Sequence, residues 1–423
     1  MKIAFAGLTH LGVCMSIGAH ESGADVVAFD TNASRVEGVR RADFDAAEPG
    51  VVDFLSGSHP RYHVTDNVMH LLDADMIMIA LDTRLDESGE NDDSEVVALL
   101  EFLASRVPTQ IPIVVASQVR PGFSRRHRDL HSELYYFMET LIFGRGLERA
   151  MHPERYIVGV ADTSTVLPAA LQRYLDMGKC PIHVMSYESA ELTKLSANFV
   201  LSANITAANS LADLAQRLGA NWEHIEAALR QDQRIGAKAY ISAGLGIGGA
   251  NLTRDLHGIK EMADRFGVDS SLASTMLGHS AYMRDWLLRE ISQLRRDRSI
   301  GSMAVLGLAY KPGTQSMRGG AGIDLVETFE SCMDIRLHDP LVSLPSRPAG
   351  SRAIAADDVE TALFTCGIVA ITTPWPEYSS ALQKYLSAVP KVVILDPFRI
   401  IDLSWVVTPA THIIQLGISD GQH

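Results

Sequence analysis

Two polar residues stand at helical spacing in an alanine-rich stretch near the middle of the chain. Lys194 and Asn198 are four residues apart in this stretch, ESAELTKLSANFVLSANITAANSLADLAQRLG, so a helix would place both on one face. An ammonium group beside an amide that donates hydrogen bonds could stabilise an alkoxide or another oxyanion. From the spacing alone, however, we favour a solvated lysine beside a packing asparagine.

Two carboxylates could supply acid–base chemistry, and each has an ordinary alternative. Glu139 lies in the aromatic and apolar segment YYFMETLIFG, where it could be an acid, a base or a buried structural residue. Asp255 closes the segment GLGIGGANLTRD, in which dense glycine precedes a predicted helix start. Such a backbone can bend around a ligand, and a helix start can hold negative charge. Taken alone, Asp255 is predicted to be a surface carboxylate favoured by the helix dipole.

A turn of sequence GLTHLG, Gly7 to Gly12, follows the apolar run KIAFA and opens a predicted helix. The next apolar run ends on Asp30. Strand, glycine turn, helix and a distant carboxylate form the pattern that binds a dinucleotide, and an acidic residue there favours NAD over NADP. Thr9 stands where a glycine would let the backbone approach the pyrophosphate, so its Cβ must be accommodated or its hydroxyl must donate to a phosphate. The alternative is a plain strand–helix turn.

Strand-like and helical segments alternate at both ends of the chain. This order predicts an α/β protein with two Rossmann-like doubly wound domains joined by a long central helical region. We place the domains at residues 1–186, 187–298 and 299–423. The central stretch predicts one helix that is capped near Ser186 or Ser189 and ends at Gly219. Its asparagines, at 198, 204 and 209, suggest buried hydrogen bonding, because asparagine is a poor residue for a helix interior.

The composition narrows the class of protein. A chain of 423 residues is too long for one core, and a net charge of −14 argues against a nucleic-acid partner. The four cysteines are scattered, so we expect neither disulfides nor a metal site. We find no signal peptide and no apolar run of about 18 residues that would span a membrane. These features predict a cytoplasmic protein.

Together, the motifs resemble those of the UDP-glucose/GDP-mannose dehydrogenase family over essentially the whole chain. ADMIMIALDTRLDESGE is similar to a family strand that ends in V-x-T-P, and ELYYFMETLIFGRGLERAMHPERYIVG to the stretch N-P-E-F-L-x-E-G followed by x-P-x-R-I-V-x-G. QDQRIGAKAYISAGLGIGGANLTRDL resembles the substrate loop D-x-R-I-G…G-F-G-G-x-C-F-x-K-D. MAVLGLAYKPGTQSMRGGAGIDLVETF resembles the C-terminal G-L-A-F-K-x-x-T-D-D-x-R-x-S.

The resemblance implies an NAD-dependent oxidoreductase that acts on a UDP- or GDP-hexose and forms a homodimer. It implies catalytic roles for Glu139, Lys194, Asn198 and Asp255. The cofactor contacts that it implies are Gly7, Thr9, His10, Leu11, Gly12, Asp30, Thr83, Ser117 and Arg318. The substrate contacts that it implies are Glu139, Lys194, Asn198, Tyr240, Gly246, Gly248, Gly249 and Lys311.

The nucleophilic cysteine of the family falls on Asn251 in this sequence, and no cysteine lies in a matching segment. A thiolate captures the aldehyde before the second oxidation, whereas an amide can only donate and accept hydrogen bonds. We expect the chain to stop after one hydride transfer, to oxidise a hydrated aldehyde directly, or to bind its ligands without catalysis. The first-step product could also proceed to a keto or epimerised sugar. We favour an active, altered dehydrogenase.

Overall fold

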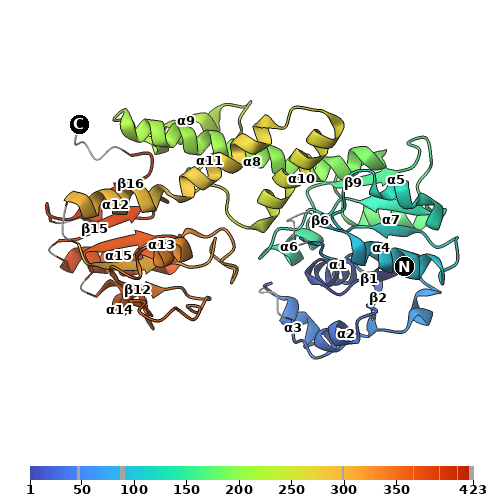
Figure 1. Ribbon diagram of the computed structural model, residues 1–423. Coiled ribbons are helices and arrows are strands. Elements are labelled where there is room, and N and C mark those ends of the chain that lie inside the picture. The colour runs from blue at the N-terminus through green and yellow to red at the C-terminus, as the bar shows by residue number, and fades with distance from the viewer. Residues whose placement is uncertain are drawn as a thin grey trace. The chain divides into compact units, whose positions relative to one another are not determined.

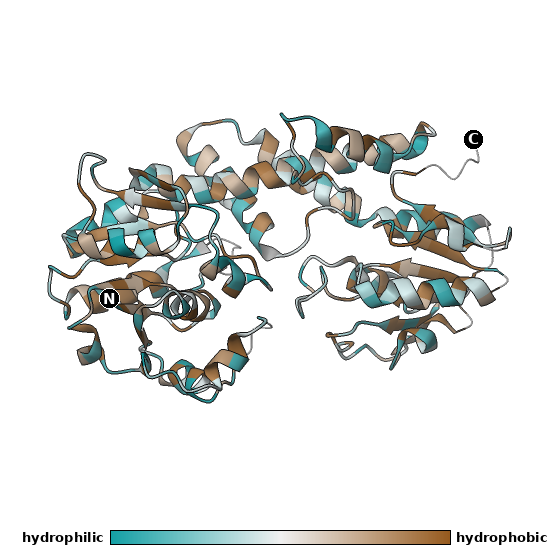
Figure 2. Ribbon diagram, turned by 180° about the vertical axis from the view of Figure 1, so that it is seen from behind, coloured by the Kyte–Doolittle hydropathy of each residue, from teal (hydrophilic) through white to brown (hydrophobic). Residues whose placement is uncertain are grey.

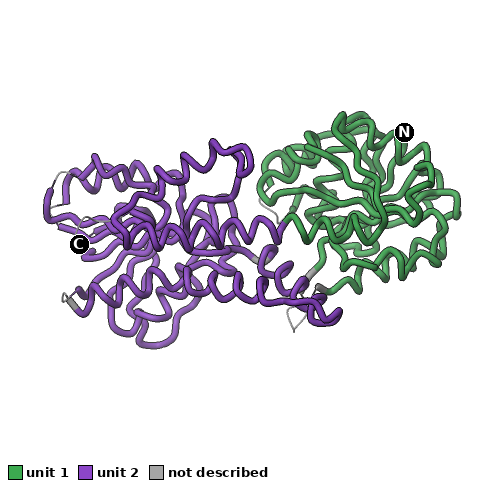
Figure 3. Tube along the Cα trace, turned by 90° about the horizontal axis from the view of Figure 1, so that it is seen from above, with its two compact units in different colours: residues 1–197 green, residues 198–423 purple. Residues whose placement is uncertain are grey.

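The computed structural model describes residues 1–44, 48–85, 91–297, 300–364, 366–389, 391–406 and 408–418. The chain divides into two compact units, Met1–Ala197 and Asn198–His423, shown in green and purple in Figure 3. Each unit contains one main β-sheet, and the long helix α8 (Tyr187–Arg217) begins in the first unit and ends in the second. The predicted fold class, two Rossmann-like sheets joined by a long helical region, is confirmed.

The sheet of the first unit has eight strands in the order β10-β9-β8-β7-β4-β1-β2-β3. Its pairs are parallel except for β8 with β9, an antiparallel pair that the sequence did not predict. The strands are β1 (Lys2–Ala6), β2 (Asp25–Phe29), β3 (Tyr62–Thr65), β4 (Met76–Ile79), β7 (Ile113–Val115), β8 (Leu134–Phe137), β9 (Tyr156–Val160) and β10 (Ile182–Ser186). A separate hairpin pairs β5 (Arg84–Leu85) with β6 (Asn91–Asp92).

Helices cover both faces of this sheet, because its strands are apolar on both sides (Figures 1 and 2). In β1, Ile3 and Phe5 point into one buried cluster, and Ala4 and Ala6 point into the other. The helices of this unit that precede α8 are α1 (His10–Glu21), α2 (Ala33–Arg40), α3 (Val51–Leu55), α4 (Ser94–Ala104), α5 (Phe123–His127), α6 (Gly146–Met151) and α7 (Ala169–Met177). Short 3₁₀ turns are η1 (Val68–Leu71) and η2 (Arg128–Leu130).

Helix α8 matches the predicted central helix closely. Its start is capped by Ser186, whose Oγ accepts a hydrogen bond from Ser189 N at 3.3 Å. The chain leaves the helix through Gly219, which has a φ of +74°. This left-handed conformation favours glycine and ends the helix.

The sheet of the second unit has six parallel strands in the order β13-β12-β11-β14-β15-β16. They are β11 (Ser302–Leu306), β12 (Asp334–His338), β13 (Ala353–Ala355), β14 (Ile368–Ile371), β15 (Val393–Asp396) and β16 (His412–Gln415). The helices packed with this sheet are α13 (Ala321–Phe329), α14 (Val359–Leu363) and α15 (Pro376–Ala388), with a 3₁₀ turn η3 (Leu403–Trp405). Alternate residues of β11 enter two cores here as well, with Met303 on one side and Ala304 on the other.

The remaining helices of the second unit follow α8 in sequence. They are α9 (Trp222–Gln231), α10 (Ala250–Phe266), α11 (Ser271–Arg284) and α12 (Trp286–Asp297). Among the described residues, we find no helix that combines the length and the hydrophobicity needed to span a membrane.

Candidate functional site

The glycine turn between β1 and α1 is shaped by its two outer glycines. Gly7 has a φ of +107°, and a Cβ on Gly12 would lie 1.7 Å from the carbonyl oxygen of Gly7. Neither position therefore tolerates a side chain. Thr9 differs, because its φ of −86° is open to any residue. The backbone of the turn therefore carries the Thr9 side chain without strain, and how this side chain meets a cofactor phosphate stays a prediction.

The hydroxyl of Thr9 is used within the protein. Thr9 Oγ1 accepts a hydrogen bond from Asp82 N at 2.9 Å and donates to Ala80 O at 3.4 Å. The carboxylate of Asp82 in turn accepts a hydrogen bond from Leu11 N, at 3.1 Å, in the first turn of α1. The sequence gave no signal for this carboxylate, which occupies a backbone donor that a cofactor phosphate would use.

Asp30 closes β2 with a buried carboxylate. Its Oδ2 accepts from Leu8 N at 2.7 Å and its Oδ1 from Asn32 N at 2.8 Å. Each carboxylate oxygen has a second lone pair, so the group can still accept hydrogen bonds from ribose hydroxyls. The glycine turn and Asp30 together fit a bound dinucleotide.

The other predicted cofactor residues divide between the two units. Ser117 Oγ accepts a hydrogen bond from Leu81 N at 2.8 Å, and Thr83 Oγ1 donates to Gln118 O at 3.1 Å. Both therefore connect the segments that follow β4 and β7, at the carboxyl edge of the sheet, where such folds bind ligands. Arg318 belongs to the second unit and is exposed. The roles of these residues stay predictions.

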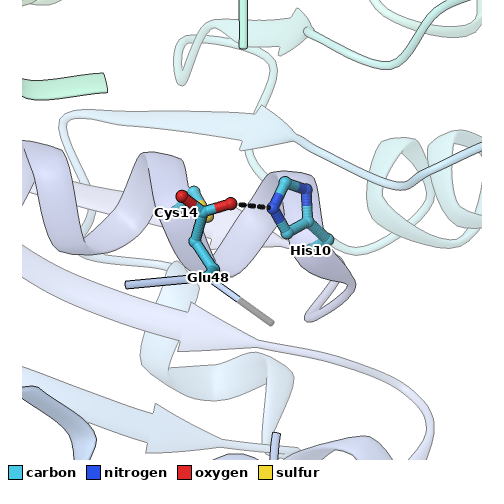
Figure 4. A group of neighbouring side chains, drawn as sticks. All are labelled: His10, Cys14 and Glu48. Carbon is cyan, nitrogen blue, oxygen red and sulfur yellow. Dashed lines mark hydrogen bonds and ion pairs between the residues drawn. The ribbon is translucent and has the colours of Figure 1, made fainter. Parts of the chain in front are cut away.

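The side chain of His10 turns toward a buried carboxylate (Figure 4). His10 Nε2 lies 2.8 Å from Glu48 Oε2, which also accepts a hydrogen bond from Gly144 N at 3.0 Å. Cys14 is one helical turn from His10, and the three ligand atoms lie within 4.8 Å of one another. Burial, with the charge of Glu48, raises the pKa of the Cys14 thiol.

Backbone hydrogen bonds fix the carboxylate of this cluster in place. Glu48 Oε1 accepts from Leu147 N at 3.4 Å, so the carboxylate ties α1 to the start of α6. A Cβ on Gly146 would lie within 3.2 Å of both Cys14 Sγ and Glu48 Oε2, which explains a glycine at this approach. His10 and Cys14 are four residues apart, a spacing that the sequence analysis did not single out, and nothing in the sequence pointed to Glu48.

Lys194 forms an ion pair with Glu139 in the first unit. The ammonium group also contacts the carbonyl oxygen of Glu139 at 3.2 Å, and both side chains are 13% exposed. Glu139 further accepts a hydrogen bond from Leu141 N at 2.7 Å. The favoured interpretation of Lys194 as a solvated residue was therefore wrong, because the turn after β8 brings a carboxylate to it.

Asp255 is buried in the second unit, with 2% of its surface exposed. Asn198 Nδ2 donates to its Oδ2 at 2.5 Å, and Arg254 Nε lies 3.0 Å from its Oδ1. The prediction of a surface carboxylate was wrong, since α8 and α10 pack together here. Asn251 stands in the first turn of α10 and is exposed.

Close steric contacts explain why glycines precede α10. A Cβ on Gly246 would lie 2.7 Å from Ser280 O, and a Cβ on Gly249 would lie 2.7 Å from the ring of Tyr310. Gly248 also lies against this ring. Asn209 Oδ1 accepts a hydrogen bond from Gly244 N at 2.8 Å, so a helix asparagine anchors the loop, as its residue type suggested.

The last two predicted substrate residues are Tyr240, which precedes this loop in the sequence, and Lys311, which follows Tyr310. Tyr240 is 50% exposed, and Lys311 Nζ lies 5.7 Å from the ring centroid of Tyr310. Their contacts with a substrate stay predictions.

The second sheet repeats the glycine turn of the first. Gly307 has a φ of +114°, and a Cβ on Gly322 would lie 2.3 Å from the carbonyl oxygen of Gly307. Asp339, at the end of the next strand, accepts backbone hydrogen bonds from Leu308 N and Ala309 N at 2.7 and 2.9 Å. Its other oxygen accepts from the two N–H groups of residues 341 and 342.

Each carboxylate oxygen of Asp339 accepts two backbone hydrogen bonds, whereas each oxygen of Asp30 accepts one. Burial opposes its ionisation, but its four backbone donors outweigh burial and hold the pKa of the carboxyl below its usual range. The second turn therefore has the shape of a dinucleotide turn without a free ribose acceptor.

The four cysteines lie outside the glycine loop. Burial raises the pKa of the thiols of Cys14 and Cys180, and raises that of Cys366 to about 11. Cys332 Sγ contacts Arg295 Nη1 at 3.2 Å, beyond the end of α13. The thiols of Cys14, Cys180 and Cys366 are therefore poor nucleophiles near neutral pH.

Comparison with known proteins agrees with this architecture. Three models of the UDP-glucose/GDP-mannose dehydrogenase family match the chain: the NAD binding domain at residues 1–175, the central domain at 188–279 and the UDP binding domain at 304–403. The chain belongs to this family of NAD-dependent nucleotide-sugar dehydrogenases.

Relatives cover almost the whole chain. The UDP-glucose 6-dehydrogenase of Pseudomonas aeruginosa is 25% identical over 438 aligned residues, covering 96% of both chains. A UDP-glucose 6-dehydrogenase of Haloferax volcanii is 25% identical, covering 95% of this chain and 97% of the relative. The UDP-glucose dehydrogenase structure from Pyrobaculum islandicum has a TM-score of 0.81 at 25% identity, covering 97% of this chain and 96% of its own. A UDP-D-ManNAc dehydrogenase structure from Pyrococcus horikoshii shares the fold, with a TM-score of 0.81 at 22% identity, covering 99% of this chain and 100% of its own.

Proposed function

We propose that this protein oxidises the C6 alcohol of a UDP- or GDP-hexose once and releases the 6-aldehyde. The alcohol loses a hydride and a proton, so the balanced products are the aldehyde, NADH and one H⁺. NAD supplies the hydride acceptor when bound. The observation that carries the proposal is Asn251 at the position where the family resemblance places a cysteine.

Two pairs of contacts, one within each unit, support the proposed chemistry. In the first unit, Lys194 would hold the developing alkoxide, and Glu139 keeps its ammonium group in place. In the second unit, Asn198 fixes the carboxylate of Asp255, which would take the alcohol proton through water. These roles follow from the family resemblance and from the two pairs of contacts.

The side chain of Asn251 cannot perform the second oxidation. Its amide nitrogen shares its lone pair with the carbonyl group, so it does not attack an aldehyde as a thiolate does. The amide could orient the aldehyde or its hydrate by hydrogen bonds. Without covalent capture, we expect the aldehyde to leave.

A catalytically inactive protein that binds NAD and a nucleotide sugar is the alternative. The hydrogen bond from Leu11 N to the carboxylate of Asp82 favours it, because that carboxylate competes with a cofactor phosphate for the same donor. An inactive protein would bind the nucleotide sugar and form no NADH.

Counting NADH separates these functions. Purified protein is incubated with UDP- and GDP-hexoses and excess NAD, and the aldehyde is trapped with a hydroxylamine. We expect one NADH per sugar consumed and one oxime per NADH. Two NADH with a uronic acid would contradict the single oxidation, and sugar binding without NADH would support the inactive alternative.

We further propose that the protein is a homodimer. Val200, Leu211 and Leu214 of α8 are 57%, 49% and 52% exposed, and their spacing places them on one face of the helix. An apolar helix stripe of this kind suits a second copy of the chain. Light scattering after size-exclusion chromatography should give twice the chain mass, and Leu211→Glu should shift it toward the monomer.

A further inference from the structure

An arginine beside Asp30 is held by a glutamate from another helix. Arg35 lies near the start of α2, and its Nη1 is 2.5 Å from Glu95 Oε1 in the first turn of α4. The same Nη1 is 3.5 Å from Asp30 Oδ2. One guanidinium group therefore faces two carboxylates, both within the first unit.

These three charged residues line one pocket of about 250 Å³. Its apolar walls include Leu99 and Phe102, which suit a flat aromatic base. The pocket begins at the carboxyl end of β2, where dinucleotide-binding folds place the adenosine ribose. It is therefore the natural place for the adenosine half of the cofactor.

Asp30 and Arg35 give this pocket opposing preferences. A carboxylate at the end of β2 selects the 2′-hydroxyl of NAD, whereas a nearby arginine accommodates the 2′-phosphate of NADP. Arg35 is such an arginine. Its side chain is 20% exposed, so it is poorly placed to find another partner in solvent.

We propose that Glu95 determines cofactor specificity by withholding Arg35 from a 2′-phosphate. Glu95 occupies the guanidinium group with a charge-assisted hydrogen bond. It also adds a second negative charge beside Asp30, which repels the phosphate. The pair contributes little to stability, because Glu95 is 49% exposed. Its effect is on the choice of cofactor.

Binding measurements on the full chain test this role. NADH and NADPH are titrated by nucleotide fluorescence against the wild type, Glu95→Gln and the double variant Arg35→Gln/Glu95→Gln. Glu101→Gln is the matched control, because Glu101 is an exposed carboxylate of the same helix outside the pocket. Thermal unfolding of each variant checks that the fold is retained, and Glu95→Ala replaces Glu95→Gln if that variant misfolds.

We expect Glu95→Gln to tighten NADPH binding about tenfold, the usual effect of one unit of charge near a phosphate, with NADH binding within about threefold of wild type. The double variant should lose the gain, and Glu101→Gln should change neither dissociation constant. Unchanged NADPH affinity in Glu95→Gln would overturn the role of Glu95, as would a gain that survives in the double variant. A wild type that binds both nucleotides equally, or neither, would overturn it too. No sugar is needed, so the outcome is independent of the proposed aldehyde product.

Discussion

Replacing Asp82 by asparagine should tighten the binding of NAD. The carboxylate of Asp82 holds Leu11 N at 3.1 Å in the first turn of α1. A phosphate that approaches this helix start must displace the carboxylate and then remain beside its charge. Asparagine keeps a similar shape and a carbonyl oxygen for Leu11 N, so the change removes the charge and little else.

The size of the effect follows from two electrostatic contributions. Two unit charges about 4 Å apart interact by about 1 kcal/mol in water, and the exposure of Asp82 argues for this lower limit. Losing a carboxylate's interaction with a helix start during binding costs about 0.3–1 kcal/mol more. The sum, roughly 1.3–2 kcal/mol, corresponds to about a 10- to 30-fold tighter dissociation constant in Asp82→Asn.

Isothermal titration of NAD into the wild type and Asp82→Asn measures this difference, with Glu101→Gln as a control for the loss of one negative charge elsewhere. The gain should shrink between low and high salt, because salt screens exposed charges. Equal affinities, or weaker binding by the variant, would refute the idea that Asp82 competes with the cofactor. A gain that is independent of salt would refute its electrostatic origin.

Three further variants test the site. Asn251→Cys places a thiol in the first turn of α10, where the helix start favours the thiolate. The number of NADH formed per sugar should then rise from one to two. A ratio that stays at one would show that the pocket has diverged further. Asn198→Ala leaves the buried carboxylate of Asp255 without its amide donor, so chemical denaturation should show a loss of about 1–3 kcal/mol, and an unchanged midpoint would count against that contact. Gly12→Ala introduces a Cβ 1.7 Å from a carbonyl oxygen of the turn, so NAD titration should detect no binding, and retained affinity would contradict the described turn.

Much of the fold could be predicted from local patterns. The positions of Gly7 and Gly12, the carboxylate at the end of β2 and the extent of α8 all follow from the order of residues along the chain. Strand alternation, helix periodicity and capping depend on neighbours within a few residues, so a single sequence contains them. The antiparallel pairing of β8 with β9 was missed, because strand direction is decided by distant connections.

The candidate site shows the opposite balance, since the sequence supplied the residues and the tertiary structure chose their partners. Lys194 pairs with Glu139, 55 residues away in the sequence, and Asn198 pairs with Asp255, 57 residues away. The tertiary structure therefore gave Lys194 a partner and buried Asp255, where the sequence alone had predicted a solvated lysine and a surface carboxylate. Asp82 at the helix start and Glu95 on Arg35 left no local pattern at all. A side chain's charge and hydrogen-bonding capacity are fixed by its type. Which group it faces is set by the packing of elements far apart in the chain, and that packing decided which carboxylates meet cations and backbone donors here.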